Sequence, residues 1–185
     1  MAQLRIIAGK FGGRWIRADV GPGTHPQGDR IRSALFNMLE SRGVLAGARV
    51  LDAFAGTGAI GLESLSRGAA RVTFLERDRT AARIIDVNIT TLNVQDRAKL
   101  IQTDVSSWTK TSPDDKYDII FADPPYQNPQ FSTVSKLAKH LQPDGLLVLS
   151  YPGKGTVPDL EGVVVVDKRI YGEAALALFR LVRKN

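Results

Sequence analysis

The segment Val50-Leu51-Asp52-Ala53-Phe54-Ala55-Gly56-Thr57-Gly58-Ala59-Ile60-Gly61 carries the clearest indication of the fold. A short apolar run is followed by closely spaced glycines and then by residues that can open a helix, which is typical of a strand, a tight turn and a helix N-terminus. The glycines follow the pattern G-x-G-x-x-G, which lets the backbone approach a nucleotide or a nucleoside closely. This stretch predicts an α/β fold with a ligand site after the first strand of a Rossmann-like sheet.

The residues that follow alternate between short apolar runs and amphipathic segments. Strands are expected at 49–53, 72–76, 99–102, 117–122 and 146–151, and helices at about 58–67, 79–92 and 130–141. Buried strands separated by helices predict a parallel sheet with right-handed crossovers. The last two runs, 163–171 and 176–182, are separated by only a few residues, so we expect an antiparallel pair at one edge.

The N-terminal region predicts two further elements. Residues 4–8 and 14–17 flank a glycine-rich turn and are expected to form a β-hairpin. After a Gly- and Pro-rich loop, Asp29 can cap a helix whose apolar residues lie on one face, and Gly43 is placed to end it.

The composition limits the chemistry. The chain has no cysteine and two histidines among 185 residues, so thiolate zinc sites and cysteine nucleophiles are excluded, and we predict no metal. No stretch approaches the ~18 apolar residues that span a bilayer. We expect a cytoplasmic monomer without a membrane partner.

The net charge of +6 is concentrated at the two ends of the chain. Residues 1–33 hold six Lys or Arg against two acids, and residues 167–185 hold five against two. Basic ends on a neutral body favour a polyanionic partner such as RNA, whose phosphates attract Lys and Arg. A scatter of solvated surface charges is the alternative interpretation.

Asp52 separates two interpretations of the glycine loop. A dinucleotide would place its pyrophosphate near this carboxylate, which would repel it. S-adenosylmethionine carries no phosphate, and a nearby carboxylate favours its ammonium and sulfonium groups. Glu76 lies 20 residues beyond Gly56, where an acid can accept hydrogen bonds from ribose hydroxyls. We therefore predict S-adenosylmethionine as the cofactor, and a nicotinamide-dependent oxidoreductase is the weakest alternative.

The adenine end of the cofactor is expected after the strand at 99–102. Asp104 is placed to reach the adenine amine and Val105 to contact the ring, although an acid in a loop can also be purely structural. The full set assigned to the cofactor is Asp52, Phe54, Gly56, Gly58, Glu76, Arg77, Asp104, Val105 and Asp123.

Asp123-Pro124-Pro125-Tyr126 follows the strand at 117–122 and is expected to carry the chemistry. The exocyclic amine of a base is a poor nucleophile, because its lone pair is delocalised into the ring. The Asp123 carboxylate and the Pro124 carbonyl can accept both amine hydrogens, and proline holds that carbonyl rigidly. Tyr126 can stack on a base that has left its helix. A plain turn is the alternative interpretation of this tetrapeptide, whose four residues we assign to catalysis.

The chain resembles a known family, the bacterial 16S ribosomal RNA guanine-N2 methyltransferases of the RsmD type, within the class I methyltransferases. The residues that carry the resemblance are Arg5-Ile6-Ile7-Ala8-Gly9, Gly13-Arg14, Asp29-Arg30-Ile31-Arg32, Leu35-Phe36-Asn37, residues 51–63, Leu65-Ser66-Arg67-Gly68-Ala69, Asp123-Pro124-Pro125-Tyr126 and Tyr171-Gly172. The chain departs from the family pattern at His25-Pro26-Gln27-Gly28, Ser33 and Glu173-Ala174.

The resemblance implies a seven-stranded, mostly parallel Rossmann-like sheet with antiparallel last strands and an N-terminal hairpin extension. It also implies methyl transfer from S-adenosylmethionine to the N2 amine of a guanine in 16S ribosomal RNA, with the RNA or the small ribosomal subunit as partner. Two alternatives stay open. A DNA adenine-N6 methyltransferase would use the same tetrapeptide but generally needs an added recognition region. A non-catalytic RNA-binding module would leave the glycine loop unexplained.

We expect two functional parts. Residues 1–28 would form a hairpin and loop extension that binds RNA, and residues 29–185 the methyltransferase domain. The basic residues assigned to RNA are Arg5, Lys10, Arg14, Arg30 and Arg32. Phe11 and Trp15 lie among these cations, and each is either a base-stacking ring or a ring that packs the hairpin on the body.

Overall fold

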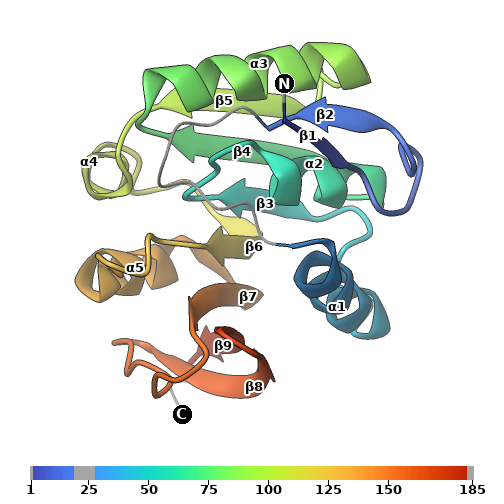
Figure 1. Cartoon of the computed structure of the whole chain (residues 1–185). Coiled ribbons are helices and arrows are strands. Elements are labelled where there is room, and N and C mark those ends of the chain that lie inside the picture. Colours follow the sequence, from blue (N-terminus) through green and yellow to red (C-terminus); the bar gives the residue numbers. More distant parts are fainter. Residues whose placement is uncertain (1, 19–27, 183–185) are drawn as a thin grey trace.

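The structure is a computed structural model that describes residues 2–18 and 28–182 (Figure 1). Its first two strands, β1 (Gln3–Arg5) and β2 (Trp15–Arg17), pair antiparallel as the expected hairpin. The other strands form one seven-stranded sheet in the order β5-β4-β3-β6-β7-β9-β8. They are β3 (Arg49–Asp52), β4 (Arg71–Glu76), β5 (Ala98–Gln102), β6 (Tyr117–Ala122), β7 (Leu141–Pro152), β8 (Val163–Tyr171) and β9 (Ala174–Leu181).

Five α-helices of the described residues connect the strands. They are α1 (Asp29–Ser41), α2 (Ala59–Ser66), α3 (Arg79–Leu92), α4 (Val105–Thr111) and α5 (Phe131–Leu137), and a 3-10 turn (Ala138–His140) follows α5. Strands β3 to β7 pair in parallel, whereas β9 is antiparallel to both of its neighbours. The fold predicted from the sequence is therefore confirmed.

The sheet separates two apolar layers. One face packs against α1, α2, α3 and the hairpin, and the other packs against α4 and α5. Neighbouring residues of β6 alternate between the layers: Ile119 and Phe121 enter the first, and Ile120 and Ala122 enter the second. This period of two explains why the central strands read as continuous apolar runs, since both of their faces are buried.

The chain changes direction across the sheet at β3. From β3 it proceeds to β4 and β5 on one side, and it then crosses back to β6 on the other side. The segments that follow β3 and β6 consequently diverge, and a ligand site is expected in the crevice between them. The glycine loop follows β3 and the Asp123-Pro124-Pro125-Tyr126 segment follows β6.

Two local expectations need correction. Asp29 does not cap α1: Gly28 is the N-cap, and Asp29 is the first helical residue, paired with Arg32. Helix α4 was not expected, because its seven residues bury only Val105 and Trp108, which is too short a pattern to read as a helix. Gly43, with a φ of +65°, lies just beyond α1 as expected.

The hairpin is packed into the main core. Ile6, Phe11 and Ile16 are buried in the same cluster as residues of α1 and α2. At Gly9 a Cβ atom would lie 2.0 Å from the carbonyl oxygen of Ser66 on α2, so only glycine permits this approach. The hairpin and the sheet thus share one apolar layer. Residues 25–27, where the chain departs from its family pattern, lie outside the described residues.

Candidate active site

A cleft of about 1040 Å³ lies at the carboxyl ends of β3, β4 and β6. Its lining includes all four residues assigned to catalysis and every residue assigned to the cofactor except Gly58, which lies within the glycine loop but does not line the cavity. It also includes residues that the sequence did not assign, among them Ile31 and Leu35 of α1, Val148 and Ser150 of β7, and Leu176 of β9. The topology therefore brings the glycine loop and the tetrapeptide Asp123-Pro124-Pro125-Tyr126 to one cavity.

The glycine loop follows β3 and leads into α2. Gly56 and Gly58 have φ angles of +54° and +76°, a region that residues with a Cβ rarely adopt. At Gly61 a Cβ would lie 2.2 Å from the Phe74 ring of β4, so the third glycine allows α2 to pack closely on the sheet. The spacing G-x-G-x-x-G thus has a structural reason at each glycine.

Asp52 ends β3 at the floor of the cleft, where its side chain is 3% exposed. Its Oδ2 accepts a hydrogen bond from the Gly61 amide at 3.0 Å. Burial raises the pKa of Asp52 to about 7, and the negative charges of Asp123 and Glu76 add to that effect. A desolvated carboxylate that faces two other carboxylates favours a cation beside it.

Glu76 ends β4 and holds the outer side of the loop. One carboxylate oxygen accepts from the Gly56 amide at 2.8 Å, and the other accepts from the Asp78 amide at 2.7 Å. These bonds fix the carboxylate at the edge of the cleft, and each oxygen keeps a further lone pair for a ligand hydroxyl. Arg77 is exposed beside it and also lines the cleft.

Asp104 caps α4. Its carboxylate accepts from the Ser107 amide at 2.9 Å and from the Ser107 hydroxyl at 2.7 Å, and these bonds lower its pKa. Asp104 therefore has a structural role as the N-cap of α4, a position at which serine, threonine, asparagine and aspartate are preferred. Val105 beside it is buried and lines the cleft. The contact of Asp104 with adenine stays a prediction.

The tetrapeptide Asp123-Pro124-Pro125-Tyr126, to which the sequence assigns the chemistry, follows β6. Asp123 is half-buried, Pro124 is buried, and Tyr126 is 38% exposed at the rim of the cleft. The Tyr126 hydroxyl lies 3.0 Å from the hydroxyl of Ser150 on the neighbouring strand β7. Ser150 is thus a residue of the site that the sequence did not reveal, because its partner lies 24 positions away.

Arg32 does not reach the surface, which corrects its assignment to RNA. Its side chain is fully buried, and its Nη2 donates to the Arg5 carbonyl at 2.9 Å and to Asp29 at 2.7 Å. Burial lowers its pKa, and the charges of Asp29 and Glu63 oppose that effect. Arg32 therefore joins α1 to the hairpin at the edge of the cleft, and its buried guanidinium is not accessible to a phosphate of RNA.

The other basic residues assigned to RNA are exposed. Arg5, Lys10 and Arg14 lie on the hairpin, and Arg30 lies in the first turn of α1. Arg14 is partly engaged, because its Nη2 donates to the Thr91 carbonyl of α3 at 2.8 Å. RNA contact by these four residues stays a prediction.

Buried polar side chains anchor the hairpin to the cofactor-binding body. Glu63 of α2 accepts from the backbone amides of Ile7 at 2.8 Å and Ala8 at 3.1 Å. Asn88 of α3 accepts from the Arg17 amide and donates to the Thr57 carbonyl of the glycine loop. No pattern in the sequence points to Asn88, since a polar residue in an amphipathic helix usually faces water.

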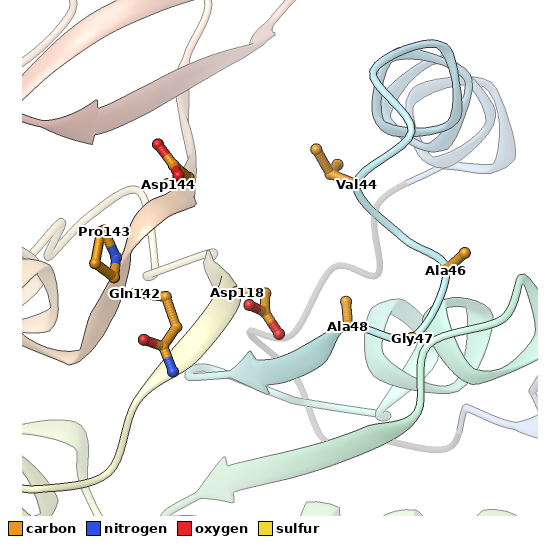
Figure 2. A pocket seen from close by; sticks show the side chains of 8 residues that line it. All are labelled: Val44, Ala46, Gly47, Ala48, Asp118, Gln142, Pro143 and Asp144. Carbon is orange, nitrogen blue, oxygen red and sulfur yellow. The ribbon is translucent and has the colours of Figure 1, made fainter.

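A second, smaller cavity of about 480 Å³ lies at the opposite end of the sheet (Figure 2). It is lined by the segment before β3 and by the first residues of β6 and β7, so it is far from the strand ends that carry the glycine loop. Its Asp118 carboxylate accepts a hydrogen bond from the Arg49 amide at 2.8 Å, which ties β6 to β3.

The part of the chain that the structure describes lacks a metal-binding cluster and a helix able to span a membrane. No group of three His, Asp or Glu side chains in residues 2–18 and 28–182 is arranged to hold a metal ion. Within the same ranges, no helix combines the length and the apolar character that crossing a bilayer requires.

Comparison with known proteins identifies the family. The family model described as Conserved hypothetical protein 95 matches residues 4–180. The chain is 30% identical to the Bacillus subtilis protein YlbH over 183 residues, which cover 96% of this chain and 98% of YlbH. It is 39% identical to the Escherichia coli ribosomal RNA small subunit methyltransferase D over 127 residues, which cover 68% of this chain and 61% of that protein.

A solved structure shows the same architecture. The Escherichia coli protein yhhF superposes with a TM-score of 0.85 at 30% identity, over 97% of this chain and 98% of that one. The glycine loop, the tetrapeptide after β6 and the N-terminal hairpin all lie within the matched residues. This chain belongs to the Conserved hypothetical protein 95 family, the family of the RsmD-type methyltransferases.

Proposed function

We propose that the protein transfers a methyl group from S-adenosylmethionine to the exocyclic N2 amine of a guanine in small-subunit ribosomal RNA. The observation that carries the proposal is the meeting of two segments in one cleft: the glycine loop after β3 and Asp123-Pro124-Pro125-Tyr126 after β6. Family membership supports a methyltransferase, and the relative from Escherichia coli is named for ribosomal RNA of the small subunit.

The residues of the cleft fit S-adenosylmethionine. Asp52 is a buried carboxylate with acidic neighbours, so the cationic methionine end of the cofactor would relieve an unfavourable charge there. Glu76 is held where it can accept from ribose hydroxyls, and Val105 offers an apolar contact for adenine. When bound, the cofactor supplies an electrophilic methyl group on a sulfonium.

Asp123 and Pro124 would prepare the target amine. Their carboxylate and carbonyl oxygens would accept the two amine hydrogens, which directs the nitrogen lone pair at the methyl carbon. With the methyl donor held by Asp52 and Glu76, the amine nitrogen would gain a bond to the methyl carbon in exchange for the carbon–sulfur bond, whose electron pair would remain with sulfur. The amine then loses one proton, for which the Asp123 carboxylate is the acceptor in reach. Tyr126 would stack on the guanine outside its helix.

The test is direct identification of the methylated nucleoside. The protein should transfer tritiated methyl groups from S-adenosylmethionine to 16S RNA or to the assembled small subunit, and digestion should yield N2-methylguanosine. Two controls accompany this test: duplex DNA should remain unlabelled, and the Asp123→Ala variant should label 16S RNA on the order of 100-fold more slowly. Recovery of N6-methyladenine from DNA instead would overturn the RNA assignment, and absence of label in every substrate would overturn methyl transfer itself.

A further inference from the structure

One face of the hairpin points away from the core. Leu4 of β1 pairs with Ile16 of β2, and Ile16 is buried against the body. Because side chains alternate along a strand, the flanking residues Arg5, Trp15 and Arg17 point outward, and all three are exposed. We call Arg5, Trp15 and Arg17 the hairpin face.

Trp15 leaves a large ring in water. Its side chain is 57% exposed, although burial of an aromatic side chain is strongly favourable. In the described part of the chain, the other aromatic ring exposed by more than a third is Tyr126, at the rim of the cleft. Phe11, the second aromatic residue of the hairpin, is buried and packs the hairpin on the body. The indole of Trp15 does not have this packing role and is accessible to a binding partner.

Two arginines flank this indole. Arg5 lies directly across the hairpin from Trp15, at a cross-strand Cβ separation of about 5 Å, and Arg17 lies two positions along β2 on the same face. Neither guanidinium takes part in an ion pair of the described residues. Arg14, which lies off this face, already bonds to Thr91. The hairpin face therefore combines one aromatic ring with two available positive charges.

The hairpin face is rigidly supported from below. The buried Asn88 side chain accepts from the Arg17 amide at 2.7 Å, and it donates to the Arg17 carbonyl at 2.9 Å and to the Thr57 carbonyl at 3.1 Å. A surface that is already ordered loses less conformational entropy when a ligand binds. The same bonds fix the distance between the hairpin face and the glycine loop.

We propose that the hairpin face binds an unpaired segment of the RNA substrate, with one base stacked on Trp15 and the adjoining phosphates at Arg5 and Arg17. Aromatic rings among cations are the groups that bind single-stranded nucleic acid without reading its sequence. A base-paired stem keeps its bases stacked inside the helix and offers the indole no free base. The inference rests on the proposed RNA substrate and adds a second stacking ring, outside the cleft, to Tyr126.

Tryptophan fluorescence tests the stacking contact. The chain has two tryptophans, and Trp108 is buried, so Trp108→Phe leaves Trp15 as the single emitter. Single-stranded oligoadenylate should quench its emission, and a blunt RNA duplex of equal length at the same salt should quench it far less. Equal quenching by the duplex, or no quenching by either RNA, overturns the proposal.

Point variants separate stacking from charge. Trp15→Ala should weaken oligoadenylate binding on the order of 10-fold to 100-fold, and Trp15→Phe should retain most of the affinity because a ring remains. Neither variant should alter the slope of log affinity against log salt. Arg5→Gln and Arg17→Gln should each reduce that slope by about 0.7. Lys168→Gln, an exposed cation on the edge strand β8, is the control and should leave affinity and slope unchanged.

Methyl transfer shows which of the two proposals fails. Trp15→Ala should raise the KM for ribosomal RNA and leave kcat near the wild-type value, because Trp15 lies outside the cleft. If Trp15→Ala binds and methylates RNA as the wild type does, the role of Trp15 is refuted and the methyltransferase stands. If Trp15 is quenched by RNA but the wild-type protein transfers no methyl group, the proposed reaction is refuted and the RNA surface stands.

Discussion

The hydroxyl of Tyr126 lies 3.0 Å from the hydroxyl of Ser150, and this bond joins the segment after β6 to strand β7. Ser150 is buried, whereas Tyr126 is more than a third exposed, so the tyrosine ring stands at the rim with its hydroxyl directed inward. Burial raises the pKa of Tyr126, which keeps the phenol protonated at neutral pH. Strand β7 thereby sets the orientation of the ring on which the target base would stack.

Loss of this bond should loosen the ring without removing it. Ser150→Ala and Tyr126→Phe should each raise the KM for RNA by about 5-fold, since a net hydrogen bond contributes about 1 kcal/mol. Tyr126→Ala should have a larger effect, because the stacking face is lost. The measurement is steady-state methyl transfer at varied RNA concentration.

A double variant checks that the two hydroxyls act as a pair. Ser150→Ala combined with Tyr126→Phe should be no worse than the poorer single variant, because one bond is removed in all three proteins. Multiplicative losses in the double variant would show that each hydroxyl has a separate role and would contradict a positioning bond.

Asp123 should affect turnover and leave cofactor binding intact. Asp123→Ala removes one of the two proposed acceptors for the amine hydrogens, and loss of a preorganised contact of this kind lowers kcat on the order of 100-fold or more. Calorimetry should show nearly unchanged affinity for S-adenosylmethionine. A variant with normal turnover would rule out a role for Asp123 in aligning the amine.

Affinity for S-adenosylmethionine should rise as the pH increases through about 7. Burial and the charges of Asp123 and Glu76 raise the pKa of Asp52 to about 7, and only the ionised form attracts the cationic methionine end. If the neutral form binds weakly, affinity should increase up to about 10-fold between pH 6 and pH 8. Binding below pH 7 should release a proton, which calorimetry in buffers of different ionisation enthalpy detects. The Asp52→Asn variant should bind S-adenosylmethionine weakly at both pH 6 and pH 8. If its affinity instead changed with pH as in the wild type, the pH dependence would belong to another group.

The stability of the ligand-free protein should change in the opposite direction. The pKa of Asp52 is raised from 3.8 to about 7, so the folded state holds this proton more tightly than the unfolded chain does. The resulting contribution to stability is fully present below about pH 4 and is lost as the pH rises through about 7. Urea unfolding should show a free energy of unfolding that is lower at pH 8 than at pH 5 by at most about 3 kcal/mol in the wild type, a decrease that Asp52→Asn lacks. Equal pH dependence in the two proteins would contradict the raised pKa.

The central strands could be predicted from the sequence because their signal is local. Strand β6 occupies the predicted residues 117–122, since each of its faces meets an apolar layer. The glycine loop could be predicted for a similar reason. Gly56 and Gly58 are required by their positive φ angles, and Gly61 is required by its close approach to Phe74, so the three glycines have a fixed spacing. The apolar run and the glycine spacing are each visible within one short stretch of sequence, even where the contact that requires them, such as Phe74, lies elsewhere.

The polar contacts beneath the hairpin could not be predicted, because they depend on residues far apart in the chain. Arg32 reads as a surface cation, yet it is buried by contacts with the Arg5 carbonyl and with Asp29. Asn88 reads as part of a polar helix face, yet it bonds to Arg17, 71 positions away. Hydrophobic periodicity shows which side of a helix is apolar and gives no information on which polar groups gain a partner when the chain folds.

Glu63 should contribute far more to stability than Glu40, although both carboxylates pair with Arg67. The Glu63 side chain is fully buried and accepts from the amides of Ile7 and Ala8 and from Arg67 Nε, whereas Glu40 is 48% exposed. Glu63→Ala would leave two amides and the Nε of the buried Arg67 guanidinium without their acceptor, so the free energy of unfolding should fall by about 3–5 kcal/mol. Glu40→Ala should lower it by less than about 1 kcal/mol. Denaturant unfolding measures the free energy of unfolding of each variant.

Hydrogen exchange tests the contact itself in a Glu63→Gln protein that remains folded. Its amide side chain presents one acceptor oxygen in place of two, so the amides of Ile7 and Ala8 should exchange faster than in the wild type. Similar stability losses in Glu63→Ala and Glu40→Ala would mean that Glu63 does not anchor the hairpin.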